Sequence, residues 1–262
     1  MPILVKREHN HAVLTLSNPT KRNAWETSSS AEIRGYLSEF EEDPSISCVI
    51  LTGDPEGKAF TAGVDSTDKS VHALEGMAEF LHSLRKSRTS GTFTTISAFP
   101  KPLIAAVNGY AVGVGAILSF CCDLVVAGRS AEWRLPQAAL GIMPTEAGVV
   151  RLAQFVGKGN AMKMALGFPM KAEQAYACGL AQWLVDDDEL MSTASSIAGS
   201  IANLAPLSVQ MIKESMSSGS DMPLQYAALA DRYRSAALLM TQDKLEGHRA
   251  WREKGKPKFQ GK

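Results

Sequence analysis

The sequence lacks an excess of charge of either sign, because 27 lysines and arginines balance 27 aspartates and glutamates. A chain without net charge has no overall field that would draw it to nucleic acid or to an anionic membrane. We therefore expect neither as a partner. An anionic ligand would have to be bound by local groups.

The sequence also has no apolar run long enough to span a bilayer, and its first twelve residues, MPILVKREHNHA, lack the apolar core of a secretory signal. Cysteine is scarce, and two of the four cysteines are neighbours that would not ordinarily pair with each other. The four are Cys48, Cys121, Cys122 and Cys178, all in apolar surroundings. This usage fits a reducing compartment and predicts a cytoplasmic protein.

Motifs of several enzyme classes are missing. The histidines have no partners at metal-ligand spacing, so we expect no metal site. No serine or cysteine stands beside an obvious base, which argues against a covalent triad. The segment Gly113-Val114-Gly115 lacks the third glycine of a dinucleotide fingerprint, and there is no P-loop.

The 262 residues, of which 45% are hydrophobic, suffice for one sizeable core. Short apolar runs predict strands at residues 3–5, 12–16, 47–52, 103–107 and 124–127, the first two joined by a polar turn as a hairpin. Helical spacing of apolar residues predicts helices at 28–42 and 71–84. Mostly helices are expected after Gly141, the first two of them at 148–155 and 161–166. This alternation indicates an α/β fold with a largely parallel sheet.

The most informative stretch is residues 102–123, PLIAAVNGYAVGVGAILSFCCD. It predicts a buried strand, a sharp turn at Asn108-Gly109, and a buried helix that begins near Gly113. The first amides of such a helix have no partner within it, and the positive end of its dipole lies behind them. The junction can therefore hold a developing negative charge.

Three segments together resemble the enoyl-CoA hydratase/isomerase family, also called the crotonase superfamily. They are KAFTAGVD at 58–65, NGYAVGVG at 108–115 and ALGIMP at 139–144. The resemblance implies a spiral of ββα units with the thioester site in residues 1–200. It also implies a helical region at 201–262 that builds trimers or pairs of trimers. Coenzyme A would enter as part of the substrate thioester, with no separate cofactor.

By position, the resemblance assigns two oxyanion donors, the amides of Ala62 and Val114. Two aligned donors would stabilise the enolate oxygen that forms when a proton leaves the carbon next to a thioester, by about 3 kcal/mol per donor. Most members carry glycine where this chain has Val114, whose branched side chain narrows the pocket. The flanking positions Gly63, Val64 and Gly113 would also contact the substrate.

The resemblance further implies that the CoA portion lies along the N-terminal loop, including Ala24, and along residues 62–65. Lys21 and Arg22 occupy positions where members often place cations near the phosphates. Trp251 and Lys254 match positions that pack against the adenine from a neighbouring subunit. Each of these cations could equally be a solvated surface charge.

Hydration in this family relies on two glutamates, and both are absent here, since their positions are held by Ile117 and Gln137. By position, the resemblance implies that Ile117 and Gln137 contact the substrate. One carboxylate appears nearby, at Glu146, and a single carboxylate suffices to migrate a double bond from 3-enoyl-CoA to 2-enoyl-CoA. We therefore expect Glu146 to be the proton shuttle of an isomerase, although it could instead cap the helix that follows.

Other interpretations stay open. Water held by Gln137 and Glu146 would make the chain a hydratase or an acyl-CoA hydrolase, and loss of catalysis would leave an acyl-CoA-binding scaffold. Asp65 and Asp123 fit structural hydrogen-bond acceptors better than bases.

Overall fold

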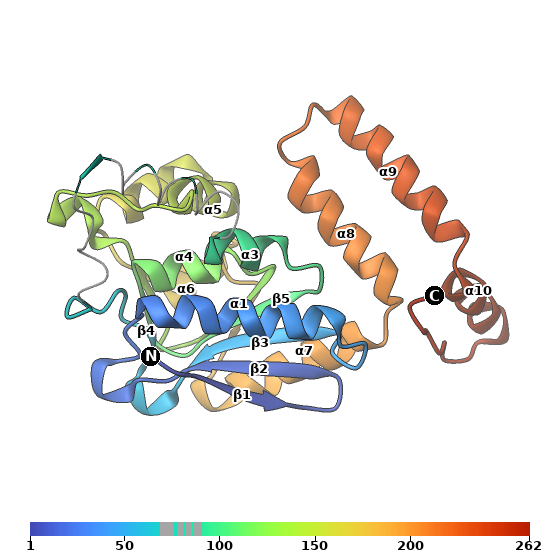
Figure 1. Cartoon of the computed structure of the whole chain (residues 1–262), viewed down its shortest axis with the longest axis horizontal. Coiled ribbons are helices and arrows are strands. Elements are labelled where there is room, and N and C mark those ends of the chain that lie inside the picture. The colour runs from blue at the N-terminus through green and yellow to red at the C-terminus, as the bar shows by residue number, and fades with distance from the viewer. Residues whose placement is uncertain (69–75, 78–80, 82–84, 86–90) are drawn as a thin grey trace.

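Two β-sheets form the framework of the chain, and the computed structural model describes residues 1–68, 76–77, 81, 85 and 91–262 (Figure 1). The larger sheet has six strands in the order β1-β2-β3-β5-β7-β10. These strands are β1 (Ile3–Arg7), β2 (His11–Leu16), β3 (Cys48–Gly53), β5 (Leu103–Val107), β7 (Leu124–Gly128) and β10 (Trp183–Val185). The β1–β2 hairpin is antiparallel, and every other pair in this sheet is parallel.

The smaller sheet has four strands in the order β4-β6-β8-β9. They are β4 (Ala59–Thr61), β6 (Tyr110–Val112), β8 (Glu132–Arg134) and β9 (Met170–Lys171). β6 pairs in parallel with β4 and β8, whereas β8 and β9 are antiparallel. The turn at Asn108-Gly109 therefore carries the chain from β5 in one sheet to β6 in the other.

Helices cover both faces of the larger sheet, as expected for parallel strands that are buried on each side. The helices that the structure describes are α1 (Thr27–Glu42), α3 (Thr92–Ala98), α4 (Val114–Phe120), α5 (Gly148–Ala165), α6 (Ala172–Ala177), α7 (Leu190–Ala202), α8 (Pro206–Gly219), α9 (Leu224–Leu239) and α10 (Gln242–Glu253). Short 3-10 turns are η1 (Pro19–Lys21), η2 (Pro55–Gly57), η4 (Pro136–Leu140) and η5 (Asp187–Glu189).

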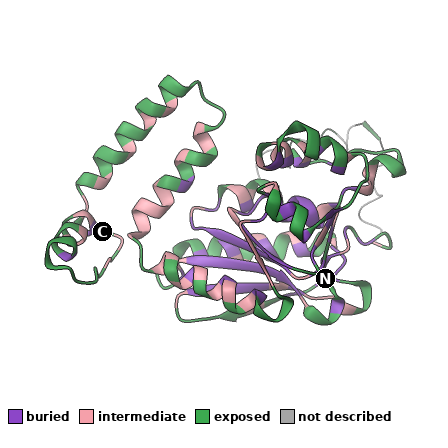
Figure 2. Ribbon diagram, turned by 180° about the vertical axis from the view of Figure 1, so that it is seen from behind, coloured by how far each residue is buried: buried purple, intermediate pink, exposed green. Residues whose placement is uncertain are grey.

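Alternate residues along each strand enter two separate cores. One face packs against α7 through Leu190, Ala194 and Ala198. The opposite face packs against α1, α4, α5 and α6 in a larger core, which includes Phe40 and Trp133. Figure 2 shows the strands buried between these helical layers. The two-sided burial fixes α4, and with it the central strand-to-helix junction, in the interior.

The C-terminal end of α1 is bound by a buried lysine. Lys101 donates from Nζ to the carbonyls of Phe40, at 2.6 Å, and Asp43, at 2.7 Å. A cation is favourable here, because the carbonyls at a helix end carry partial negative charge. Burial among these carbonyls nevertheless lowers the pKa of Lys101.

The structure confirms the predicted β1–β2 hairpin, the helix over 28–42 and the central buried strand. It corrects the central junction, because β6 lies between the turn and α4. Two helices expected at 148–155 and 161–166 form one element, α5, which contains a non-helical residue at Gly157. The helix expected over 71–84 falls largely on residues outside those that the structure describes.

The last three helices extend away from the sheets (Figure 1). α8 and α9 pack side by side as an antiparallel pair, and none of the residues of α9 is buried. α8 is attached to the core by Lys213, which pairs with Asp123 at 2.6 Å and donates to the carbonyl of Lys101. The domain boundary predicted at residue 200 stays a prediction.

Among the residues that the structure describes, no helix is both long enough and apolar enough to cross a membrane.

Candidate active site

The end of β4 and the start of α4 lie in direct contact. A Cβ atom on Gly115 would come within 2.5 Å of Thr61 Cγ2 and 2.8 Å of the Thr61 carbonyl oxygen. A Cβ on Gly63 would come within 3.2 Å of the Val112 carbonyl oxygen. Gly115 has no room for a side chain, and Gly63 has a φ of 99°, which side-chain-bearing residues rarely adopt. These glycines let the two main-chain segments approach each other, as the β4–β6 pairing requires.

The first of the two predicted donors lies at this contact. Val114 is the first residue of α4, so its amide has no acceptor within the helix. Gly113 precedes it with a φ of 54°, and its own amide donates to the carbonyl of Arg134 at 2.8 Å. The turn is thus anchored on the neighbouring strand β8, while no hydrogen bond occupies the amide of Val114 among the described residues.

The amide of Ala62 does not fit the role predicted for it. It donates to the carbonyl of Arg22 at 3.0 Å and so holds the N-terminal loop against the end of β4. A donor already engaged in this way cannot also bind a thioester oxygen without breaking that bond. The neighbouring position, Val64, therefore becomes the better candidate.

The main-chain amide of Val64 points away from Trp25, because the neighbouring residues Gly63 and Asp65 make the hydrogen bonds to Trp25. The Trp25 amide donates to the carbonyl of Gly63 at 2.7 Å, and the Asp65 amide donates to the carbonyl of Trp25 at 2.8 Å. In such a parallel bridge, the residue between these two bonds points its own amide away from the partner strand. No described group accepts a hydrogen bond from the Val64 amide, and the residue is 45% exposed.

Glu146 sits in an unusual turn at the start of α5. It and Ala147 both have left-handed backbone angles, with φ of 55° and 56°. Such angles cost non-glycine residues of order 1–3 kcal/mol each, and they concentrate at functional sites. The Glu146 side chain forms no hydrogen bond or ion pair with a described residue, and α5 has no side-chain cap. Helix capping therefore does not explain this residue.

The side chain of Gln137 lies beside the start of α4. Its Nε2 atom is 3.4 Å from the position that a Cβ on Gly113 would take. Its Oε1 atom is buried and has no hydrogen-bond partner among the described residues. A buried polar atom without a partner is costly, so this oxygen is suited to a donor that the substrate or a water molecule supplies.

Comparison with known proteins identifies the group to which this site belongs. A family model described as "Enoyl-CoA hydratase/isomerase" matches residues 6–262. The chain belongs to the enoyl-CoA hydratase/isomerase family. It is therefore an enzyme of a family that acts on acyl-CoA thioesters, and the α/β fold predicted from its motifs is confirmed.

Its relatives are similar over their whole length. The 2,3-dehydroadipyl-CoA hydratase of Escherichia coli (strain K12) is 35% identical, with 99% of each chain covered. The (E)-benzylidenesuccinyl-CoA hydratase of Thauera aromatica is 33% identical, with 100% of each covered. The crystal structure of enoyl-CoA hydratase from Bacillus anthracis has a TM-score of 0.90 and 30% identity, with 99% of each chain covered.

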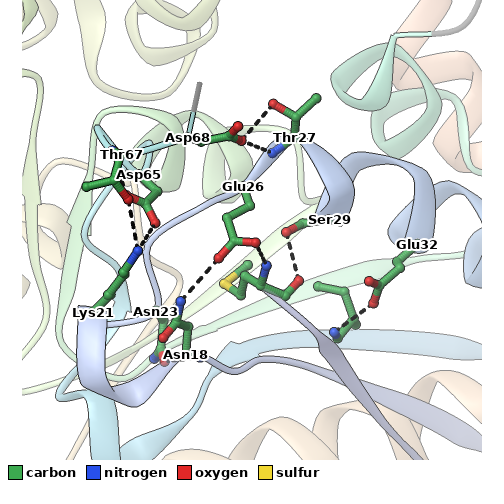
Figure 3. Close-up of polar contacts among 12 residues, drawn as sticks. Asn18, Lys21, Asn23, Glu26, Thr27, Ser29, Glu32, Asp65, Thr67 and Asp68 are labelled. Carbon is green, nitrogen blue, oxygen red and sulfur yellow. Dashed lines mark hydrogen bonds and ion pairs between the residues drawn. The ribbon is translucent and has the colours of Figure 1, made fainter. Parts of the chain in front are cut away.

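Lys21 and Asp65 pair with each other beside the site (Figure 3). The Lys21 ammonium lies 2.6 Å from Asp65 Oδ2, and the other carboxylate oxygen accepts from the amide and hydroxyl of Thr67. These hydrogen bonds from Lys21 and Thr67 lower the pKa of Asp65 to about 2. Asp65 is thus a structural acceptor, as predicted, and it binds the cation that we expected near the phosphates.

The other predicted CoA-binding residues lie in two places. Ala24 is buried in the N-terminal loop, and Arg22 is exposed there, with its guanidinium forming no described ion pair. Trp251, at 83% exposure, and Lys254 lie at the end of α10, in the C-terminal region that extends away from the sheets (Figure 1). A role toward CoA from there requires a neighbouring subunit, as the resemblance implies.

The sequence missed two features of the site. The outward-facing amide of Val64 depends on the bridge to Trp25, a pairing between distant segments that no local pattern shows. Ile117, expected to contact substrate, is only 3% exposed, because the start of α5 covers it. Among the described residues, no group of three or more acidic, histidine or cysteine side chains could hold a metal ion.

Proposed function

We propose that this enzyme moves a carbon–carbon double bond in an enoyl-CoA, converting 3-enoyl-CoA to 2-enoyl-CoA. The observation that carries the proposal is the contact between β4 and α4. It brings together the segments that carry the Val64 and Val114 amides, and neither amide has a hydrogen-bond acceptor among the described residues. The thioester oxygen would accept a hydrogen bond from each. Negative charge that develops on that oxygen would then be stabilised by about 3 kcal/mol per donor.

Glu146 would supply the proton chemistry. Its carboxylate takes a proton from the carbon next to the thioester carbonyl, and the electron pair moves onto the thioester oxygen to form a dienolate. The same carboxyl group then returns the proton two carbons further along the chain. The reaction needs one carboxylate and no water, which agrees with the absence of glutamate at positions 117 and 137.

Hydration is the second candidate, and a specific observation favours it. The buried Oε1 atom of Gln137 lacks a described partner and could accept a hydrogen bond from a water molecule that Glu146 activates. The names of the similar proteins are also mostly those of hydratases. Water held in the same way could instead hydrolyse the thioester, and a chain without either activity would remain an acyl-CoA-binding scaffold.

We also propose that copies of the chain associate as a trimer or a pair of trimers in the cytoplasm. Exposed apolar side chains in the C-terminal helices support this, since monomers rarely leave such surface uncovered. The most exposed are Met216, Leu224, Tyr233, Met240 and Trp251. Association would bring Trp251 and Lys254 of one copy toward the CoA of another.

The test is to incubate the enzyme separately with 3-enoyl-CoA and 2-enoyl-CoA, following the absorbance of the conjugated thioester. Isomerisation produces conjugation from the first substrate, and hydration removes it from the second. Glu146→Gln should lower isomerisation at least 100-fold, the usual contribution of a positioned acid–base group. Full activity in that variant would refute the role of Glu146. Binding without turnover would favour the scaffold.

A further inference from the structure

A cavity of about 950 Å³ lies between the end of α4, the start of α5 and α8. It begins directly beside the proposed catalytic turn, because Ala147 is one of its lining residues. Cys121 and Ser97 form part of its inner wall, and Val150 and Arg151 project from α5. The cavity is thus adjacent to the proposed acid–base residue.

Arg151 is a cation in the lining of this cavity. It is half-buried, and its Nε atom donates to the main-chain carbonyl of Glu146 at 3.4 Å. Among the described residues, it forms no ion pair with a carboxylate. Lys213, the other cation of the lining, is already paired with Asp123, and Asp221 lies on the exposed turn after α8.

One face of α4 runs from the thioester position toward the cavity, beneath the start of α5. Val114, Ile117 and Cys121 are three and four residues apart, so they follow one side of the helix over about 10 Å. Ile117 touches Gly148, and Cys121 lines the cavity. Burial raises the pKa of the Cys121 thiol, while the charges of Arg151 and Glu146 act on it in opposite directions. Both charged groups therefore lie near the cavity end of this face.

We propose that the enzyme prefers acyl chains that end in a second carboxylate, and that Arg151 binds this distal carboxylate in the cavity beside α5. The position of the thioester in this inference rests on the proposed function. With its carbonyl at the Val64 and Val114 amides and its reacting carbons at Glu146, the chain would pass the turn at Ala147, which lines the cavity, and reach Arg151 there. A guanidinium matches a carboxylate through two parallel hydrogen bonds, which gives both affinity and orientation.

The experiment measures binding rather than turnover. Isothermal titration compares adipoyl-CoA with hexanoyl-CoA, two saturated thioesters of equal chain length that have no double bond to move. The wild-type enzyme should bind adipoyl-CoA about 10-fold more tightly or better, the effect of a hydrogen-bonded charge pair. The monomethyl ester of adipoyl-CoA, which lacks the distal charge, should lose this advantage without any change to the protein.

Two variants locate the receptor. Arg151→Gln should bind both thioesters with similar affinity, whereas Arg151→Lys should keep part of the preference. Arg129→Gln is the control, since Arg129 forms an exposed ion pair with Asp186 and does not line the cavity. Its selectivity should equal that of the wild type.

Equal wild-type affinity for adipoyl-CoA and hexanoyl-CoA would overturn the proposal. So would a uniform loss of affinity for both ligands in Arg151→Gln, which would indicate a structural role. If light scattering showed a changed assembly in that variant with selectivity intact, Arg151 would serve a contact between subunits instead. Selective binding in an enzyme that isomerises no enoyl-CoA would refute the proposed reaction and leave the carboxylate site standing.

Discussion

Gly148 lies against the side chain of Ile117 so closely that a Cβ atom on the glycine would come within 2.7 Å of Ile117 Cγ1. Ile117 occupies one of the two positions where a catalytic glutamate is missing, and Gly148 begins the helix that follows Glu146. This contact sets the distance between α4 and the turn that carries the proposed acid–base residue. The effect of this contact on stability and on activity can be tested by substitution.

Gly148→Ala should overpack this contact and lower the free energy of unfolding by about 1–3 kcal/mol. Isomerase activity should fall further than stability alone explains, because the turn with Glu146 moves. Urea denaturation and steady-state kinetics measure the two effects. The double variant Gly148→Ala/Ile117→Ala, which makes room for the added methyl group, should regain part of the activity. No recovery in the double variant would show that the contact does not position Glu146.

Val114→Pro should remove one proposed oxyanion donor while keeping the helix. Proline is tolerated at the first helical position, where its missing N–H has no helical acceptor. We expect kcat to fall roughly 100- to 1000-fold, the usual cost of one such donor, with the α-helical circular dichroism signal retained. Val114→Ala, which keeps the amide, is the matched control and should stay active. Comparable losses in both variants would argue against the amide.

Because of the Lys21–Asp65 pair, the stability of the folded protein should depend on pH in the acid range. The pKa of Asp65 is lowered to about 2 in the folded chain, so the unfolded state binds the proton more readily. The stabilisation is therefore fully present above the ordinary aspartate pKa of about 4, and it is lost as the pH falls toward 2. Urea midpoints of the wild type and Asp65→Asn across this range should converge at low pH. Parallel curves would contradict the assignment.

Lys213→Ala should be among the most destabilising changes in α8. It leaves Asp123, whose pKa is raised by burial, without its partner, and the loss of a hydrogen bond between charged groups in this part-buried position costs about 1.5–3 kcal/mol. Thermal unfolding should show a lower Tm. Lys213→Ala/Asp123→Asn removes both charges and should recover part of the loss. If the double variant were as unstable as the sum of the single changes, the pairing energy would be negligible.

Much of the fold could be predicted from local patterns. Apolar spacing located α1, and the apolar run after Pro102 located β5, since each depends on neighbouring residues alone. β6 and β10 were missed because strands of three residues carry little periodicity. β6 is defined by its pairing with β4 and β8, and β10 by its pairing with β7. Short strands in mixed sheets are products of tertiary contact.

The site could be predicted only in part, because one of its donors also depends on tertiary contacts. The donor role of Val114 could be predicted from its place at the start of a helix, which the glycines on either side indicate. Whether the donor on β4 is Ala62 or Val64 depends on which side each amide faces, and the main chain of Arg22 and Trp25 decides that. Those residues are about forty positions away in sequence, so no motif of a few residues could separate the two.

The contact between Thr61 and Gly115 joins two stretches of main chain, and the proposed polarising groups are peptide amides rather than side chains. Mutational drift can exchange the residues at 64, 114, 117 and 137 and leave those groups in place. Such substitutions would change which reaction follows activation of the thioester: double-bond migration, addition of water or hydrolysis. The activation step itself would stay the same. Loss of both glutamates would then mark a change of chemistry, with the catalytic apparatus retained.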